Sequence, residues 1–146
     1  MHLFIADDDP DDILFLQEAF KEISKNIKIT SAKNGQELLK FVQLVIPDLI
    51  VLDINMPCMD GLDCLEELRR SKRLDHVPII MYSTGIREEH IDRSYALGAS
   101  RYIKKPTYVS SITQQMSTLV SLNMADLRSQ PPRDKFFIGL NETTGF

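Results

Sequence analysis

Three short runs of apolar residues constrain the fold of this chain more than any other feature. Residues 3–6, 49–52 and 79–82 are apolar at every position. A strand with no polar face is buried on both sides of its sheet, which is typical of parallel sheets. Two weaker strands are expected at residues 27–31 and 101–104. These runs predict a sheet whose two faces are both covered.

Amphipathic helical patterns separate the expected strands. In four segments apolar residues recur at three- and four-residue steps, and a fifth segment, residues 87–97, has the thinnest apolar stripe. The four stripes contain Ile13, Leu16, Phe20 and Ile23; Leu38, Val42 and Val45; Leu62, Leu65 and Leu68; and Val109, Ile112, Met116 and Leu119. The order strand, helix repeats five times and predicts an α/β fold with helices on both faces of a parallel sheet.

Length and composition favour one such domain. The chain has 146 residues, 43% of them hydrophobic, which suffices for one well-buried core. We expect this domain to cover residues 1–123. The remaining residues, 124–146, are expected to be a mostly disordered tail without an output domain. An apolar run at residues 136–140 leaves open the alternative of a packed arm.

Several classes of protein are disfavoured by charge and hydropathy. A formal net charge of −4 argues against a nucleic-acid-binding protein that depends on phosphate contacts. The chain lacks an apolar run near the length of about 18 residues that a membrane span needs. The N-terminus does not have the pattern of a signal peptide. Cys58 and Cys64 match no zinc or redox spacing, so a cytoplasmic location is expected.

The stretch DDDPDD, directly after the first strand, holds five aspartates in six positions. Asp9 precedes a proline, which is typical of a helix N-cap with proline at the first helical position. Asp11 and Asp12 then fall in the first turn, where the helix dipole favours negative charge. Helix initiation therefore explains three aspartates and leaves Asp7 and Asp8 at the carboxyl end of the strand.

Asp53 stands in the same topological place, because it directly follows the apolar run at residues 49–52. If the two strands are neighbours, Asp7, Asp8 and Asp53 converge at the edge where open parallel sheets form their sites. Three adjacent carboxylates repel one another unless a cation joins them. Oxygen ligands alone favour a hard ion such as Mg2+. A lone aspartate would be a polar strand end, but this convergence predicts a metal site.

Polar residues also follow the fourth and fifth strands. Ser83 and Thr84 offer hydroxyl groups, and Lys104 and Lys105 offer ammonium groups. A lysine here can reach an anion at the sheet edge, although most lysines are solvated at the surface. Carboxylate, divalent metal, hydroxyl and ammonium together are suited to phosphoryl transfer. The histidines are not placed to act as a general base, so a hydrolase triad is not expected.

Four segments resemble the receiver domains of two-component response regulators, in family order and with similar intervals. They are ADDDP, DLIVLDINMPCMDG, VPIIMYSTG and GASRYIKKP, within residues 3–123. The resemblance is to stand-alone, chemotaxis-regulator-like members. It implies a flavodoxin-like fold, a five-stranded parallel sheet of strand order 2-1-3-4-5 surrounded by five helices.

The resemblance implies that Asp53 is the phosphoacceptor and that Mg2+ is the cofactor. Asp8 and Asp53 would hold the ion directly, and Asp7 would hold it through water. Asn55 would contribute its backbone carbonyl. The phosphoryl donor would be a histidine kinase or a hybrid kinase.

The same resemblance assigns the switch residues. Ser83 would hydrogen-bond a phosphoryl oxygen, and Lys105 would pair with it. Tyr102 would turn inward when Ser83 is pulled towards the phosphate, although a half-buried strand aromatic is the plainer interpretation of that residue. Pro106 matches a proline that a cis bond often precedes in this family. Thr84 departs from the small residue that many relatives carry.

The leading hypothesis is a phosphorylation-operated switch that is not a turnover enzyme and whose downstream target is unknown. Self-association through the face of the fourth helix, fifth strand and fifth helix is a further expectation. One alternative is a Mg2+-dependent phosphatase of the haloacid dehalogenase type. Such enzymes carry an aspartate two residues after the nucleophile, where this chain has Asn55. Another alternative is an unphosphorylated adaptor, which the intact site set disfavours.

Overall fold

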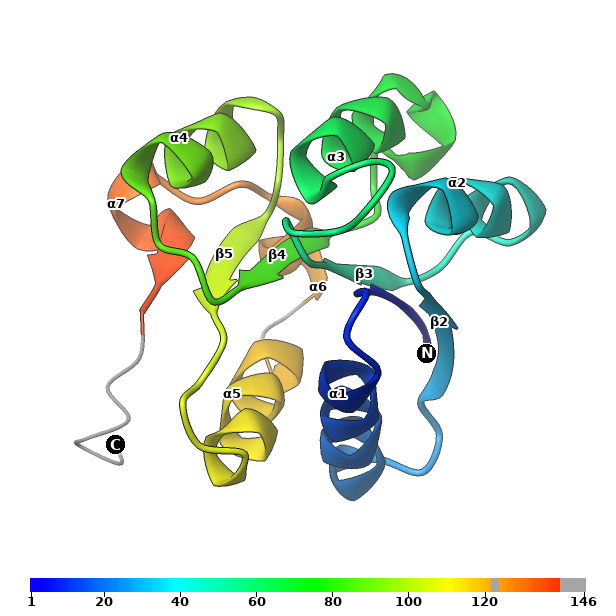
Figure 1. Cartoon of the computed structure of the whole chain (residues 1–146), viewed down its shortest axis with the longest axis vertical. Coiled ribbons are helices and arrows are strands. Elements are labelled where there is room, and N and C mark those ends of the chain that lie inside the picture. Colours follow the sequence, from blue (N-terminus) through cyan, green and yellow to red (C-terminus); the bar gives the residue numbers. More distant parts are fainter. Residues whose placement is uncertain (122–123, 140–146) are drawn as a thin grey trace.

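One sheet of six parallel strands runs through the computed structural model, which describes residues 1–121 and 124–139 (Figure 1). The strand order is β2-β1-β3-β4-β5-β6. The strands are β1 (His2–Ala6), β2 (Lys28–Ala32), β3 (Leu49–Leu52), β4 (Ile79–Ser83), β5 (Arg101–Lys104) and β6 (Phe137–Ile138). The first five strands and their order confirm the predicted flavodoxin-like architecture, and β6 is an addition to it.

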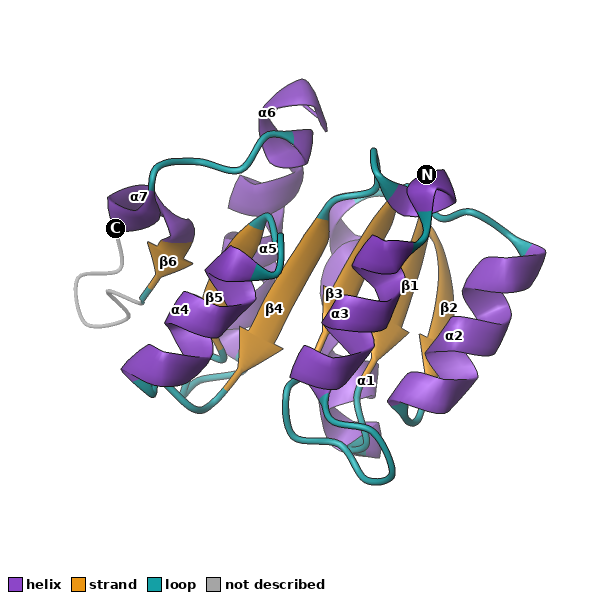
Figure 2. Ribbon diagram, turned by 90° about the horizontal axis from the view of Figure 1, so that it is seen from above, coloured by secondary structure: helices purple, strands orange, loops and turns teal. Residues whose placement is uncertain are grey.

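Helices cover both faces of this sheet. Figure 2 shows α2, α3 and α4 together in front of the strands, while α1 and α5 lie behind them. The helices are α1 (Pro10–Ile23), α2 (Gly35–Leu44), α3 (Gly61–Arg70), α4 (Glu88–Ala96), α5 (Ser110–Ser121), α6 (Met124–Arg128) and α7 (Arg133–Phe136), with a 3-10 turn, η1 (Lys72–Leu74). No helix among the described residues combines the length and apolarity needed to cross a membrane.

Each face of the sheet has its own apolar core, because successive strand residues point to opposite sides. On the face of α2, α3 and α4, Phe4 and Ile50 pack with helix residues such as Leu65. On the face of α1 and α5, Ile5 packs with residues such as Phe20. These two cores fix the strands, so the strand ends become a rigid platform.

Side-chain caps fix where three helices begin. Asp9 caps α1 by accepting a hydrogen bond from the amide of Asp11, and a proline occupies the first helical position. Asn34 caps α2, and Asp60 caps α3. The N-cap prediction for Asp9 is therefore confirmed. Because α1 and α3 are the helices that follow β1 and β3, these caps also position the loops at the carboxyl ends of those strands.

The prediction of a mostly disordered tail is wrong for residues 124–139. They form α6, α7 and β6, and β6 extends the sheet by pairing in parallel with β5. Leu127 and Phe136 are fully buried, which explains why this segment is ordered. Residues 140–146, including the end of the apolar run, lie outside the described residues.

Candidate functional site

The carboxyl ends of β1 and β3 bring the predicted metal ligands together. These strands are neighbours, with Ala6 paired to Leu52, so Asp7 and Asp53 emerge side by side. Carboxylate oxygens of Asp7, Asp8 and Asp53 all lie within 4.8 Å of one another. Asp7 and Asp53 are 1% and 5% exposed, whereas Asp8 is exposed. The convergence inferred from strand order is thus present in the fold.

Lys105 reaches this cluster from the end of β5. Its Nζ lies 2.9 Å from Asp7 Oδ2 and 3.5 Å from Asp53 Oδ2. The lysine side chain is 9% exposed, so it is not a solvated surface lysine. A single ammonium group therefore faces two buried carboxylates, and the local charge stays negative.

Asp12 also contacts this lysine, which sequence reasoning missed. Asp12 Oδ2 lies 2.8 Å from Lys105 Nζ, the shortest of the three contacts. The residue lies in the first turn of α1, where helix initiation alone had accounted for it. One available signal was its position two residues into a helix that begins at the site edge of the sheet.

Burial and crowding shift the proton affinities of this cluster. Burial raises the pKa of Asp53 to about 7, Lys105 opposes that rise, and the charge of Asp7 adds to it. Burial likewise raises the pKa of Asp7. Burial alone would lower the pKa of Lys105, but its hydrogen bond to Asp12 and the charge of Asp53 raise it above its usual value. Such raised carboxylate pKa values are expected where negative charges lack a sufficient counter-charge.

A glycine keeps the loop after Asp53 close to the site. Gly61 donates its amide to the carbonyl of Ile54 at 2.7 Å. A Cβ at Gly61 would lie 2.1 Å from the backbone oxygen of Asp53 and 2.6 Å from the Cα of Ile54. Only glycine permits this approach, so the start of α3 is packed directly against the backbone that carries Asp53.

Ser83 and Tyr102 are linked through the loop that follows β4. Ser83 is 1% exposed, and its Oγ accepts a hydrogen bond from the amide of Gly85 at 3.2 Å. Tyr102 is fully buried and donates its hydroxyl to the carbonyl of Gly85 at 2.6 Å. The role of Tyr102 as a switch residue stays a prediction. A continuous set of contacts joins the end of β4 to β5.

Three other predicted positions have plainer surroundings. The backbone of Asn55 hydrogen-bonds the carboxylate of Asp53, which stabilises its charged form, and the side chain is exposed. Thr84 is exposed beside Ser83. The described residues contain no cis peptide bond, so the expectation of a cis bond before Pro106 is wrong.

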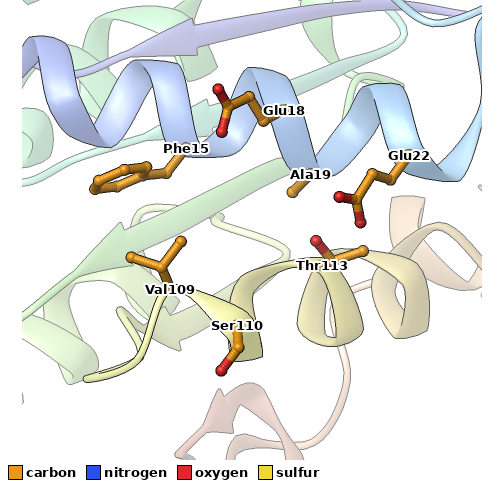
Figure 3. A pocket seen from close by; sticks show the side chains of 7 residues that line it. All are labelled: Phe15, Glu18, Ala19, Glu22, Val109, Ser110 and Thr113. Atoms are coloured by element: carbon orange, nitrogen blue, oxygen red, sulfur yellow. The ribbon is translucent and has the colours of Figure 1, made fainter.

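A separate pocket of about 330 Å³ lies between α1 and α5 (Figure 3). Phe15 and Ala19 of α1 face Val109 and Thr113 across it, while Glu18 and Glu22 extend from α1. The full lining is Phe15, Glu18, Ala19, Glu22, Val109, Ser110 and Thr113. None of the predicted site residues lines this pocket, so the chemistry is concentrated at the strand ends.

The arrangement at the strand ends combines two binding capacities. Three converging carboxylates fit a hard divalent cation, because the buried charges of Asp7 and Asp53 exceed what Lys105 neutralises. Lys105 and the hydroxyl of Ser83 come from the neighbouring strands β5 and β4, where an anion bound at the same edge could be held. Such a site suits a phosphoryl group that is held between a metal ion and an ammonium group.

Comparison with known proteins gives a family match over most of the chain. Residues 3–117 match the family model described as the response regulator receiver domain. The response regulator SaeR of Staphylococcus aureus is 36% identical over 132 residues, which are 89% of this chain and 54% of that protein. A probable cyclic di-GMP phosphodiesterase of Vibrio cholerae is 27% identical over 116 residues, 80% of this chain and 26% of that protein.

These curated relatives are longer than the matched region. The chain spans about half of SaeR and about a quarter of the phosphodiesterase. A solved structure of similar size is the phosphorylated cyanobacterial phytochrome response regulator RcpA. It is 29% identical, with a TM-score of 0.76, and the match covers 81% of this chain and 89% of that chain. The similarity therefore lies in the domain that carries the acidic cluster.

Proposed function

The chain belongs to the response regulator receiver domain family, and from that premise we propose that it is a signalling switch operated by phosphorylation of Asp53. The observation that carries the proposal is the buried carboxylate of Asp53, which lies beside Asp7 and Asp8 and within reach of Lys105. Receiver domains are generally signalling domains rather than turnover enzymes. The relative RcpA has been solved in a phosphorylated form, which supports the same chemistry here.

Asp7, Asp8 and Asp53 would hold Mg2+, with the backbone carbonyl of Asn55 as a further ligand. The carboxylate set fits the ion, since its oxygens lie within 4.8 Å of one another and its buried charge is not balanced by Lys105. When bound, Mg2+ supplies positive charge that offsets the repulsion between a carboxylate and a phosphoryl group.

The residues of the chain then divide the chemical work. A carboxylate oxygen of Asp53 attacks the phosphorus atom, and the bond from phosphorus to the donor's histidine nitrogen breaks as the new bond forms. Lys105 pairs with the added negative charge. Ser83 Oγ accepts a hydrogen bond from the amide of Gly85, and its own hydroxyl hydrogen would be donated to a phosphoryl oxygen.

The phosphoryl donor would be a histidine kinase or a hybrid kinase, and the loaded state would be read by a separate protein. The raised pKa of Asp53 bears on this role, because a neutral carboxyl group is a poor nucleophile. Cation binding would favour the charged form of the same group. Metal binding and reactivity are therefore expected to be linked at neutral pH.

The test is to incubate the chain with acetyl phosphate, with and without Mg2+, and to measure both protein-bound phosphate and free phosphate. The proposal predicts at most one equivalent of bound phosphate per chain, formed only with Mg2+, and slow release. Asp53→Asn should bind none. Rapid release of many equivalents of phosphate would instead indicate a phosphatase, and equal labelling of Asp53→Asn would exclude Asp53 as the acceptor.

A further inference from the structure

Residues 130–139 run along the outer edge of the sheet, where α7 lies beside α4 and β6 pairs with β5 (Figure 2). Phe137 pairs with Tyr102 and Ile138 with Ile103, so β6 occupies the edge that β5 would otherwise expose. This edge is part of the face through which self-association was expected from the sequence. In this chain its own tail occupies that face.

Apolar contacts hold the tail in place. Phe136 is fully buried, and its ring lies edge-on to Tyr95 of α4 with the ring centroids 5.0 Å apart. The ring of Phe137 lies 5.9 Å from that of Tyr102. The two adjacent aromatic residues of the tail therefore contact both walls of the face, one on α4 and one on β5.

Ion pairs and hydrogen bonds also join the tail to α4. Arg133 of α7 pairs with Asp92 at 2.7 Å and with Glu88 at 2.7 Å, two acidic residues one turn apart on α4. Tyr95 donates its hydroxyl to the carbonyl of Pro131 at 2.8 Å. Gln130 donates to the carbonyl of Tyr95 at 2.6 Å. An acidic helix is thus matched to a basic segment.

Together these contacts define the kind of segment that the face recognises. It has a proline stretch, then an arginine, then an aromatic pair beginning three residues later, and it finishes as an added parallel strand. Adding a strand to an exposed sheet edge is a general mode of peptide recognition, in which backbone pairing supplies affinity and side-chain pockets supply specificity.

We propose that the face formed by α4 and β5 is a docking surface for a protein segment of this chemistry, and that residues 130–138 are its resident occupant, which a partner must displace. The ion pairs of Arg133 involve Glu88 and Asp92 side chains that are 77% and 59% exposed, so they are screened and easily exchanged. A tethered segment has an effective concentration on the order of millimolar, so a ligand that binds this face only weakly cannot displace it.

The occupant also affects Tyr102. With β6 paired to β5, the ring of Tyr102 is covered by Phe137, and its hydroxyl is held by Gly85. Displacement of the tail would uncover this ring beside the loop that follows Ser83. A partner that replaces the tail would therefore contact Tyr102, whose hydroxyl bonds the loop that follows Ser83. This inference does not depend on the chemistry of Asp53.

The experiment uses the full chain and a fluorescent peptide with the sequence of residues 128–139. Binding is measured to the unaltered chain, to Arg133→Glu, to Phe136→Ala, and to Lys135→Glu as a control with the same charge change on the same short helix. Lys135 is exposed, so the control should behave like the unaltered chain. We expect at least tenfold tighter binding to Arg133→Glu and Phe136→Ala, because their own tails compete less well.

Hydrogen exchange supplies a second readout that does not need the peptide. Amides of residues 136–139 should exchange faster in Arg133→Glu and Phe136→Ala than in the unaltered chain or in Lys135→Glu. A peptide that itself carries Arg133→Glu should bind at least tenfold more weakly. Equal peptide binding by all four proteins, no binding to either tail variant at about millimolar peptide, or unchanged exchange in both tail variants would each overturn the proposal.

Discussion

The acidic site and the tail-covered edge lie at different margins of the same sheet and are held by opposite kinds of interaction. At the site, buried Asp7 and Asp53 share one lysine, and burial raises the pKa of both carboxyl groups. At the edge, Phe136 is buried among apolar atoms and Arg133 meets two acidic side chains. The acidic site concentrates negative charge, whereas the tail and the edge it covers have complementary apolar and charged surfaces.

This difference indicates what each region is built for. Like charges held together out of water reduce stability, and such clusters are typical of sites that bind cations or carry out chemistry. Complementary contacts between a tail and a surface favour the folded state but can be exchanged for similar contacts with a partner. The site should therefore respond to metal and pH, while the edge should respond to competing segments.

The largest effect is expected from Gly61→Ala. The new Cβ would lie 2.1 Å from the backbone oxygen of Asp53, and backbone cannot move aside as a flexible side chain can. We expect a loss of at least about 3 kcal/mol in the free energy of unfolding, measured by urea titration. Gly85→Ala is the matched control, because its Cβ would meet only Ser83 Oγ at 3.8 Å. Equal losses in the two variants would show that the site backbone is not tightly constrained.

The second effect is a pH dependence of the free energy of unfolding that arises at the acidic site. Burial raises the pKa of Asp53 from 3.8 to about 7, so the folded metal-free chain holds this proton more tightly than the unfolded chain. The resulting stabilisation is complete below about pH 4 and is lost as the pH rises through about 7. We expect a loss of roughly 2–3 kcal/mol, less than three full pKa units would give, because neighbours share the charge.

Urea titrations at about pH 5 and about pH 8 would measure this loss. Asp53→Asn should flatten the profile, and Mg2+ should stabilise the chain most at the higher pH. Asp134→Asn, an exposed change on α7 of the tail, should leave the profile unaltered. If the free energy of unfolding of Asp53→Asn depended on pH as strongly as that of the unaltered chain, the titrating group would not be Asp53.

The third effect concerns Asp12 and should appear in the rate of phosphorylation. Asp12 shares Lys105 with the site and adds a negative charge that faces an incoming phosphate. Asp12→Asn should therefore speed phosphorylation by acetyl phosphate roughly 3- to 10-fold, since a partly screened charge contributes on the order of 1 kcal/mol. Asp11→Asn, an exposed change in the same helical turn, is the control. Slower labelling of Asp12→Asn would show instead that Asp12 helps to hold Lys105 in its working position.

The smallest effect is expected at the edge. Arg133→Ala removes two ion pairs whose acidic partners are largely exposed, so the free energy of unfolding should fall by less than about 1 kcal/mol. Lys135→Ala should have no measurable effect. A loss of several kcal/mol in Arg133→Ala would mean that the ion pairs of Arg133 are essential to the folded state and not exchangeable, and the contrast between the two regions would fail.

The same contrast explains what could be predicted from the sequence. Asp7, Asp8, Asp53, Ser83 and Lys105 each follow a short strand, so the rule that parallel strands end at one edge was sufficient to bring them together. Asp12 was missed because helix initiation already explained an acidic residue there. Its contact with Lys105 joins residues 93 positions apart, and only the folded chain reveals that pairing.

The tail was missed for a different physical reason. β6 contains two residues and α7 contains four, which is too short for a periodic apolar pattern to emerge. Arg133 and Phe136 are ordered by partners on α4 that no local signal identifies. Tertiary contacts decide the structure of such segments, whereas the strands of the central sheet carry their own signal.

The most direct test of the account is to locate the phosphoryl group. The chain would be treated with acetyl phosphate and Mg2+, the acyl phosphate would be reduced with borohydride, and the modified residue would be identified by peptide mass spectrometry. The account predicts modification at Asp53 alone, and none when Mg2+ is withheld. Modification at Asp7, Asp8 or Asp12, or labelling of Asp53 that is independent of Mg2+, would contradict it.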